Sequence, residues 1–436
     1  MGKGYRSYEP DQDYLLPPSL RDWLPENHLA YFVSDVIDNV DLTAMDEVYG
    51  DERRGQPPYD PRMMTKLLVY GYCVGVFSSR RIERRLMEDI AFRVLAAGNT
   101  PNFRTISDFR KIHLKTLEAL FEQVLRIALE AGAVKVGRVA LDGTKVKANA
   151  SKHKAMSYGR MQEKEKEIRA EVKQMLARAE AADEEEDARY GEDRRGDELP
   201  AELGRRESRL QKIREAKKAL EARAREKAAT AGEDPQQAQP AEKDQYNFTD
   251  PQSRIMKGAD GFVQAYNAQA AVEPDLQLIV GQTVTAAAND KEQLLPMVEV
   301  IEQQSGQRPG EVLADSGYCS EKNLEQLDAE QNPDRRMAGY IATGKQKHGE
   351  YRKPCPRGPL PHDATRVDRM KRKLQTKAGK AIYAARKTIV EPVFGQIKQA
   401  RGFRQFLLRG IEKVRGEWAL VCLTHNILKF YRLCYQ

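Results

Sequence analysis

The chain has 436 residues, enough for two or three domains, and its 40% hydrophobic content is typical of a soluble protein with a sizeable core. Its 72 Lys and Arg exceed its 65 Asp and Glu and leave a net charge of +7, which suits a polyanionic partner. No apolar run approaches the roughly 18 residues of a membrane span, and no secretory leader is recognisable. The five scattered cysteines contain no CxxC pair, which argues against a zinc ribbon, a disulfide scaffold and a redox dithiol and favours a cytoplasmic protein.

Residues 1–131 are expected to form a helical N-terminal domain. Met63, Leu67 and Leu68 recur at helical spacing after Pro61. A second helix is expected after Ser79, and a third over about 105–131. The second helix begins with a dense basic cluster, for which contact with nucleic acid and a solvated face are about equally probable. The cluster comprises Arg80, Arg81, Arg84 and Arg85.

Residues 132–436 are expected to form an α/β domain. The order is strand, insertion, strand, strand, helix, strand, helix, strand, and a long helix follows from about 380 to 408. The first pairings can be hairpins and the later ones need crossovers, so the predicted sheet is mixed and five-stranded. The strands are predicted at 136–148, 262–272, 278–285, 311–315 and 337–343, and residues 344–380 are expected to be loop-like.

The insertion after the first strand, residues 151–245, is crowded with Lys, Glu, Arg and Ala. Thin apolar stripes, one with Ile168 and Val172 and one with Leu210 and Ile213, predict two long helices. An acidic stretch over 183–187 and Pro200 lie between them and are expected to interrupt the helices. We therefore predict a charged helical hairpin.

Two aspartates end predicted strands of the sheet. Asp142 stands in LDG, and Asp315 stands in ADSG. Ligands collect at this rim in open α/β folds. Two carboxylates brought close together there repel one another unless a divalent cation lies between them, and Mg²⁺ prefers such oxygen ligands. A single aspartate after a strand is more often a turn or a helix cap, so the pair carries the metal-site hypothesis.

The chain resembles the bacterial insertion-sequence transposases of the DDE type, and it is most similar to insertion-sequence family five and its relatives. The resemblance covers nearly the whole chain, and its least specific part is the hairpin. It rests on the motifs LDGTKVKANAS, GFVQAYNAQAAV, VLADSGYCS, TIVEPVFGQIK and WALVCLTHNILKF, and on YDPRMMTKLLVYGYCVGVFSSRRIERRL and PNFRTISDFRKIH near the N-terminus.

The resemblance implies an RNase H-like catalytic core over 132–436 and a DNA-binding domain over 1–131. It implies that Asp142, Asp315 and Glu391 form a catalytic triad that binds Mg²⁺, for which Mn²⁺ substitutes. The implied activity is excision of an insertion sequence followed by strand transfer. The implied partners are double-stranded DNA, as terminal inverted repeats and target, and a second copy of the chain in a homodimer.

Related transposases carry a Tyr-Arg-Glu-Lys signature on the last catalytic helix. Tyr383, Glu391 and Lys398 fit it. The basic position is open, because the signature places three residues between Arg and Glu, whereas Arg386 leaves four and Lys387 leaves three. At 100° per residue Lys387 shares a face with Glu391 on an unbroken helix, so geometry favours Lys387. The basic residue and Lys398 would hold the phosphate backbone, as would Lys145 and Lys147 beside Asp142.

A basic stretch before this helix also fits a DNA track better than a solvated loop. It comprises Arg352, Lys353, Arg357, Arg366, Arg369, Lys371, Arg372 and Lys373. Two alternative functions remain open: a related metal-dependent DNA nuclease that does not join strands, and a non-catalytic DNA-binding protein derived from a transposase.

Overall fold

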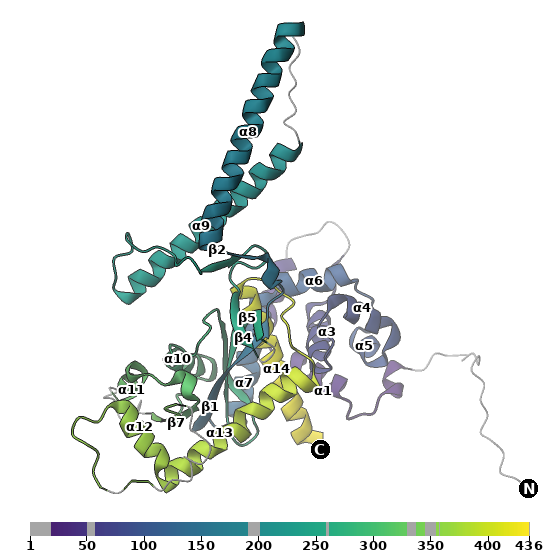
Figure 1. The fold of residues 1–436 in the computed structure, drawn as a ribbon. Helices are drawn as coiled ribbons and strands as arrows, with labels where there is room; N and C mark the ends of the chain where they lie inside the picture. Colours follow the sequence, from purple (N-terminus) through teal and green to yellow (C-terminus); the bar gives the residue numbers. More distant parts are fainter. Residues whose placement is uncertain are drawn as a thin grey trace, which may run out of the picture.

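The computed structural model describes residues 19–49, 57–190, 201–258, 261–328, 337–344, 355–356 and 358–435. A mixed β-sheet with packed helices forms the centre, a cluster of helices forms the N-terminal part, and a helical hairpin projects away from both (Figure 1). No helix among the described residues is long and apolar enough to cross a membrane.

The N-terminal part is helical, as predicted. Asp60 starts α3 by accepting hydrogen bonds from the amides of Arg62 and Met63, and Pro61 occupies the first helical position, where its missing amide hydrogen costs nothing. The helix expected over 105–131 is divided at His113, and Asn102 caps its first half. The helices are α1 (Leu29–Asp38), α2 (Thr43–Asp46), α3 (Pro61–Cys73), α4 (Ser79–Glu88), α5 (Ile90–Leu95), α6 (Phe103–Ile112) and α7 (Leu114–Glu130).

The central sheet is mixed but has six strands, so the prediction of five was wrong. The order is β4-β5-β1-β7-β8, and β6 pairs with β5. The strand pairs that contain β5 are antiparallel, and β1–β7 and β7–β8 are parallel. The strands are β1 (Arg138–Lys147), β4 (Arg254–Gly258), β5 (Gly261–Val272), β6 (Ile279–Thr285), β7 (Glu311–Ala314) and β8 (Ala338–Ile341).

The extra strand, β4, shares one edge of the long β5 with β6. β4 pairs with residues 261–265 of β5, and β6 pairs with residues 267–272. A five-residue strand with only Met256 buried carries too little apolar pattern to be recognised from the sequence.

The insertion forms the predicted hairpin, in which α8 (Tyr158–Tyr190) lies beside α9 (Ala201–Ala231) (Figure 1). Its own small core includes Met161, Ile168, Leu210 and Ile213. The short strands β2 (Ala155–Ser157) and β3 (Gln245–Asn247) join it to the sheet. Residues 183–187 continue α8, so the expected break there was wrong.

The C-terminal part covers the sheet with helices. Residues 366–375, expected as loop, form α12, because Thr365 and Asp368 make a reciprocal capping box at its start. The long helix ends earlier than predicted, at a π-helical turn over Gln396–Ala400. The helices are α10 (Leu294–Ser305), α11 (Glu321–Asp328), α12 (Arg366–Gln375), α13 (Lys377–Gly395) and α14 (Ile411–Tyr435).

Helix α14 links the N-terminal helices to the sheet, since it packs against α3, α7 and β6. Trp418 on this helix is fully buried and donates its indole hydrogen to the Gln269 carbonyl on β5. The two faces of the sheet are covered by different helices. Ile301 of α10 packs against Gly281 of β6, whereas α13 reaches β1 from the other side. The division of the chain at residue 131 stays a prediction.

Candidate active site

The register of two parallel strands brings the first two predicted acids to one level. β1 and β7 pair from Arg138 opposite Glu311 to Ala140 opposite Leu313. Two residues further along each strand are Asp142 and Asp315. Asp315 caps the 3-10 turn Ser316–Tyr318 by accepting the Gly317 amide at 2.8 Å. The turn fixes the direction of this carboxylate beside β1.

The environment of Asp142 disfavours its charged form. Burial raises the pKa of this carboxyl to about 6, Arg386 opposes the rise, and the nearby charge of Asp315 adds to it. A hydrogen bond from the Gly143 amide at 2.9 Å holds one of its oxygens. The charge of Asp142 is therefore costly, and a cation beside it would be favourable.

Helix α13 brings a guanidinium and the third acid to this place. Arg386 is 7% exposed, and one of its nitrogens donates to Asp142 Oδ2 at 3.3 Å. Another of its nitrogens lies 3.8 Å from a carboxylate oxygen of Glu391, whose side chain is 54% exposed. Lys387 is exposed and forms no ion pair among the described residues. The structure therefore places Arg386, and not Lys387, beside the acids, while the choice between the two for the signature's basic position stays a prediction.

The reason lies in which face of α13 is buried. Arg386, Val390, Val393 and Ile397 follow the helical repeat i, i+4, i+7 and i+11, and all four are buried against the sheet. Alignment with Glu391 was the wrong criterion, because Asp142 lies on the sheet beneath that face. The length of the arginine side chain lets its guanidinium also approach Glu391 at the flank of the helix.

The other signature residues surround the same place. Lys398 donates to Thr144 Oγ1 and to the Lys145 carbonyl at 2.7 Å, which ties the π-helical turn to β1. Burial, together with the nearby positive charges of Lys145 and Arg404, lowers the pKa of Lys398 to about 8. Tyr383 is half-buried beside Arg386, and burial raises its pKa. Contact of these residues with DNA stays a prediction.

The sequence reasoning missed a fourth carboxylate at the site, Asp290, in the loop between β6 and α10. Its Oδ1 accepts hydrogen bonds from the side-chain amides of Asn267 at 2.7 Å and Gln269 at 2.6 Å. Lys145 Nζ lies 3.9 Å from the same oxygen, and burial lowers the pKa of this lysine. The available signal was a third acid following a predicted strand, although four residues separate Asp290 from the end of β6.

Gly143 makes room for this polar cluster. A Cβ at Gly143 would lie 2.3 Å from Gln269 Nε2 and 2.7 Å from Asp290 Oδ1. At Gly317 a Cβ would lie 2.9 Å from Asp315 Oδ1 and 3.4 Å from Asp290 Oδ2. Asp290 thus lies close both to Gly143 on β1 and to Gly317 in the turn after Asp315, and the glycine after Asp142 is needed for space.

The remaining predicted DNA-contact residues lie outside this cluster. Arg80, Arg81, Arg84 and Arg85 are exposed on α4, with Arg80 stacked over the Phe103 ring at 4.7 Å and Arg85 3.8 Å from Asp89. Lys147 is exposed at the end of β1. Of the basic stretch before α13, residues 366–373 lie on α12, whereas Arg352, Lys353 and Arg357 lie outside the described residues.

The donor chemistry at the site fits a hard divalent cation. Carboxylate oxygens of Asp142, Asp315 and Glu391 are available, and Arg386 already supplies positive charge between two of them. No group of three or more His, Cys, Asp or Glu side chains in the described part of the chain is yet close enough to hold a metal ion. A bound cation would therefore have to draw the acids together and take over charge compensation from Arg386.

Comparison with known proteins gives two family matches. Residues 18–112 match a transposase domain family (DUF772), and residues 360–431 match a transposase DDE domain family. No curated protein and no solved structure matches the chain significantly. The second match contains α12, α13 and most of α14, and with them Arg386, Glu391 and Lys398. Both matches, one toward each end of the chain, are to transposase families, and they support a relationship of this chain to insertion-sequence transposases of the DDE type.

Proposed function

We propose that the protein excises an insertion sequence and joins it to target DNA, with Asp142, Asp315 and Glu391 as the ligands of catalytic Mg²⁺ or Mn²⁺. One observation carries the proposal: parallel pairing of β1 and β7 puts Asp142 and Asp315 at one level, and Arg386 of α13 approaches both Asp142 and Glu391. An RNase H-like core is the fold that the DDE domain match implies.

When bound, the metal would activate the attacking oxygen and stabilise the leaving oxygen of a phosphodiester in an in-line displacement. The side chains of the protein would bind the metal and the phosphate and hold them in position. The amides of Gly143 and Gly317 each hold one oxygen of Asp142 and of Asp315, so the second oxygen of each carboxylate would be left for the cation. Arg386 places positive charge where the phosphate would approach, and Lys398 fixes the end of the catalytic helix to β1.

No side-chain nucleophile is needed in this scheme. Water attacks first and releases a 3′-hydroxyl at the element end, and that hydroxyl then attacks the target strand. Joining two element ends needs two active sites, and we therefore propose a homodimer on DNA. We also propose that the protein belongs to insertion-sequence family five and its relatives, which its motifs resemble.

The test is cleavage of a DNA that carries the terminal repeats flanking the gene, with Mg²⁺ or Mn²⁺ supplied. We expect metal-dependent nicks at the repeat ends and joined products with a target plasmid. Asp315→Asn should abolish both while DNA binding survives, and Asp363→Asn, at an exposed aspartate without an ion pair in the described residues, should retain both. Cleavage without joining would assign a nuclease instead.

The non-catalytic alternative has one observation in its favour. The guanidinium of Arg386 lies between Asp142 and Glu391, where it already satisfies charge that a metal would otherwise satisfy. Binding of the repeats without cleavage, by a preparation shown to assemble on them, would support a DNA-binding protein derived from a transposase.

A further inference from the structure

Two segments of the chain carry positive charge and no negative charge. Residues 143–162, which follow Asp142, contain five Lys and Arg and no Asp or Glu. Residues 392–411, which follow Glu391, contain four Lys and Arg and no Asp or Glu. Charged residues make up 31% of the chain and both signs are abundant, so two such stretches, each starting beside a proposed catalytic acid, are unusual.

The fold lays these two segments side by side. The Lys147 amide donates to the Arg404 carbonyl at 3.2 Å, and the Phe406 amide donates to the Lys147 carbonyl at 2.9 Å. Further along, Asn149 Nδ2 donates to the Leu407 carbonyl at 2.7 Å, and Arg409 Nε donates to the Asn149 carbonyl at 2.9 Å. The loop after the catalytic helix, residues 404–409, therefore runs beside residues 147–149 at the end of β1.

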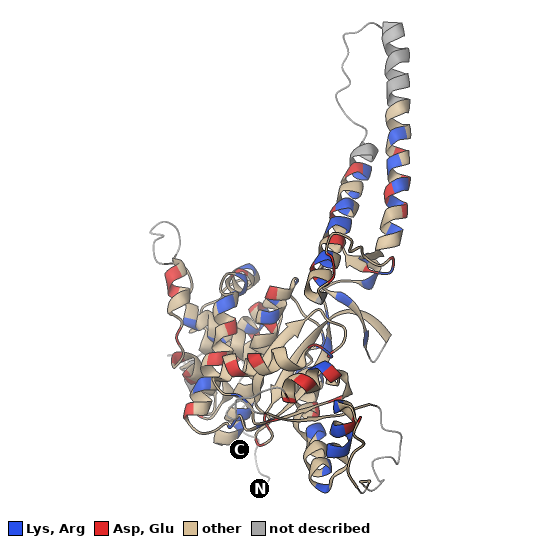
Figure 2. Cartoon of the chain, turned by 90° about the vertical axis from the view of Figure 1, so that its left-hand side faces the viewer, with Lys and Arg blue, Asp and Glu red and all other residues tan. Residues whose placement is uncertain are grey.

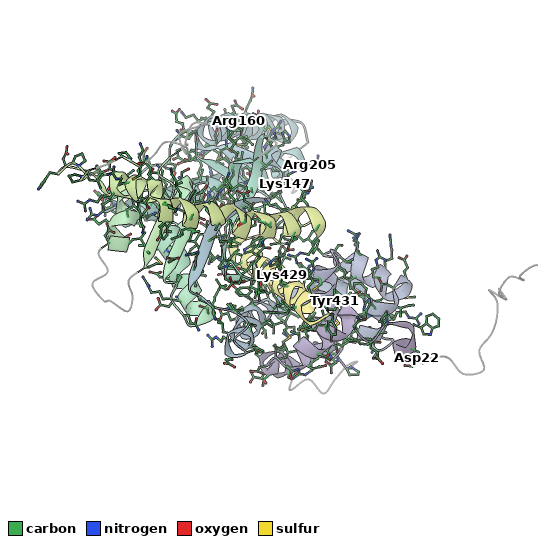
Figure 3. All side chains as sticks on the ribbon, turned by 90° about the horizontal axis from the view of Figure 1, so that it is seen from below. Asp22, Lys147, Arg160, Arg205, Lys429 and Tyr431 are labelled. Atoms are coloured by element: carbon green, nitrogen blue, oxygen red, sulfur yellow. The ribbon has the colours of Figure 1, made fainter. Side chains whose placement is uncertain are left out.

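Five exposed cations line this junction, and we call them the basic ridge: Lys147, Lys152, Lys154, Arg404 and Arg409. Within the described residues none of them forms an ion pair. Figure 2 shows Lys and Arg gathered at the foot of the hairpin, and Figure 3 places the labelled Lys147 on the same side as Arg160 of α8. Like charges gathered without counter-ions repel one another, and a bound polyanion would relieve that repulsion.

The ridge begins next to the proposed catalytic acids. The amine of Lys398 donates to Thr144 and to the Lys145 carbonyl, close to Asp142. The backbone carbonyl of Lys398 accepts a hydrogen bond from Arg404 Nε at 3.2 Å, so the same residue also contacts the ridge. Lys147 lies five residues beyond Asp142 on β1. At about 3.3 Å per residue this is about 17 Å, or about five base-pair steps of a duplex.

We propose that the basic ridge is a track for the phosphate backbone of the DNA on which the active site acts, running from Asp142 to the foot of the hairpin. The proposal rests on the proposed function, because that function supplies DNA as the partner. It assigns the ridge a sequence-independent role, since exposed lysine and arginine ends contact phosphates without reading bases. It also assigns the insertion a role in DNA binding, because Lys152 and Lys154 lie where the chain enters the hairpin.

The test measures binding of the full-length protein to a fluorescein-labelled duplex of arbitrary sequence over a salt series without divalent metal. The ridge variant K147Q/K152Q/K154Q removes three exposed amines that make no hydrogen bonds within the described residues. Each lost phosphate contact flattens the slope of log K against log salt by about 0.9, so we expect a slope smaller by about two to three. Melting curves show whether the variants are folded.

A matched control removes the same charge elsewhere. R126Q/K135Q/R432Q changes three exposed cations on α7, before β1 and at the far end of α14. We expect its slope to equal that of the wild type. Equal slopes for the ridge variant and the wild type, or equal losses in both triple variants, would overturn the proposal. Loss of self-association by the ridge variant with unchanged DNA affinity would also overturn it and assign the ridge to a second copy of the chain.

Cleavage of repeat DNA by the same preparations separates the two proposals. If the wild type cleaves and the ridge variant keeps the wild-type slope, the track is refuted and the proposed function stands. If the salt dependence of DNA binding is weaker in the ridge variant and unchanged in the control variant, but the wild type never cleaves, the track stands and the catalytic proposal is refuted.

Discussion

Neutralising Asp142 should stabilise the metal-free protein. Burial raises the pKa of this carboxyl from the usual 3.8 to about 6, against the opposing charge of Arg386. That difference corresponds to about 3 kcal/mol by which the ionised carboxylate destabilises the folded state. Asp142→Asn removes the charge and keeps the size of the side chain. We therefore expect the variant to unfold with a free energy higher by up to about 3 kcal/mol at neutral pH.

The sign of the pH dependence follows from the raised pKa. Below the usual value of 3.8 the carboxyl is protonated in both states and contributes nothing. As the pH rises from there to about 6, the unfolded chain releases its proton first, so the wild type loses stability. The difference in the free energy of unfolding between Asp142→Asn and the wild type should increase over this pH range and stay constant above it.

Urea unfolding in the presence of a chelator, from about pH 4 to about pH 8, measures this gap. Asp363→Asn, at an exposed aspartate, is the control and should leave the stability unchanged. Adding Mg²⁺ should narrow the gap, because the wild-type carboxylates gain a counter-ion that the variant binds less well. If Asp142→Asn is less stable than the wild type at neutral pH, or if the difference in stability does not depend on pH, the ionised carboxylate does not destabilise the folded state.

Three further substitutions test buried contacts by urea unfolding, two of them around the site and one between α3 and α14. Gly143→Ala should destabilise the protein by about 1–3 kcal/mol, because its Cβ would lie 2.3 Å from Gln269 Nε2, whereas Gly137→Ala, with nothing within 4 Å, should not; equal effects would contradict this account. Asp290→Ala should cost about 1–3 kcal/mol and Asp290→Asn less, since asparagine keeps an acceptor for Asn267 and Gln269, and the reverse order would count against this hydrogen-bonding role. Tyr72→Phe should cost about 1–3 kcal/mol, because its hydroxyl lies 3.0 Å from the fully buried Glu417 and accepts from Arg110 at 3.1 Å; a neutral result would show that water replaces it.

The features that could be predicted from the sequence are those that apolar periodicity and the ends of apolar runs indicate. Asp142 and Asp315 each follow a run of buried residues, and this pattern pointed to both acids. Asp315 directly follows β7, as predicted, but Asp142 lies within β1, which continues to Lys147, so the prediction that Asp142 ends its strand was wrong. The hairpin was predictable because its apolar stripe, though thin, recurs over both long helices. Helix α12 was missed because six of its ten residues are charged and its start depends on the capping pair Thr365 and Asp368.

The basic partner of the acids could not be chosen from one helix alone. Angular position relative to Glu391 favoured Lys387, but the side chain that meets Asp142 is decided by which face of α13 packs on β1. Asp290 was missed for a similar reason. Its role depends on the amides of Asn267 and Gln269, which β5 presents opposite Lys145 and Gly143, and cross-strand pairing is a property of the sheet.

The proposed mechanism requires that Asp142, Asp315 and Glu391 act together on DNA through a divalent metal. The most direct measurement is cleavage of a DNA carrying the flanking terminal repeats, with Mg²⁺ or Mn²⁺, by the wild type, Asp142→Asn and Glu391→Gln. We expect metal-dependent cleavage at the repeat ends by the wild type, and loss of cleavage with retained DNA binding in both variants. Cleavage by either variant at the wild-type rate, or binding without cleavage by an assembled wild-type complex, would contradict it.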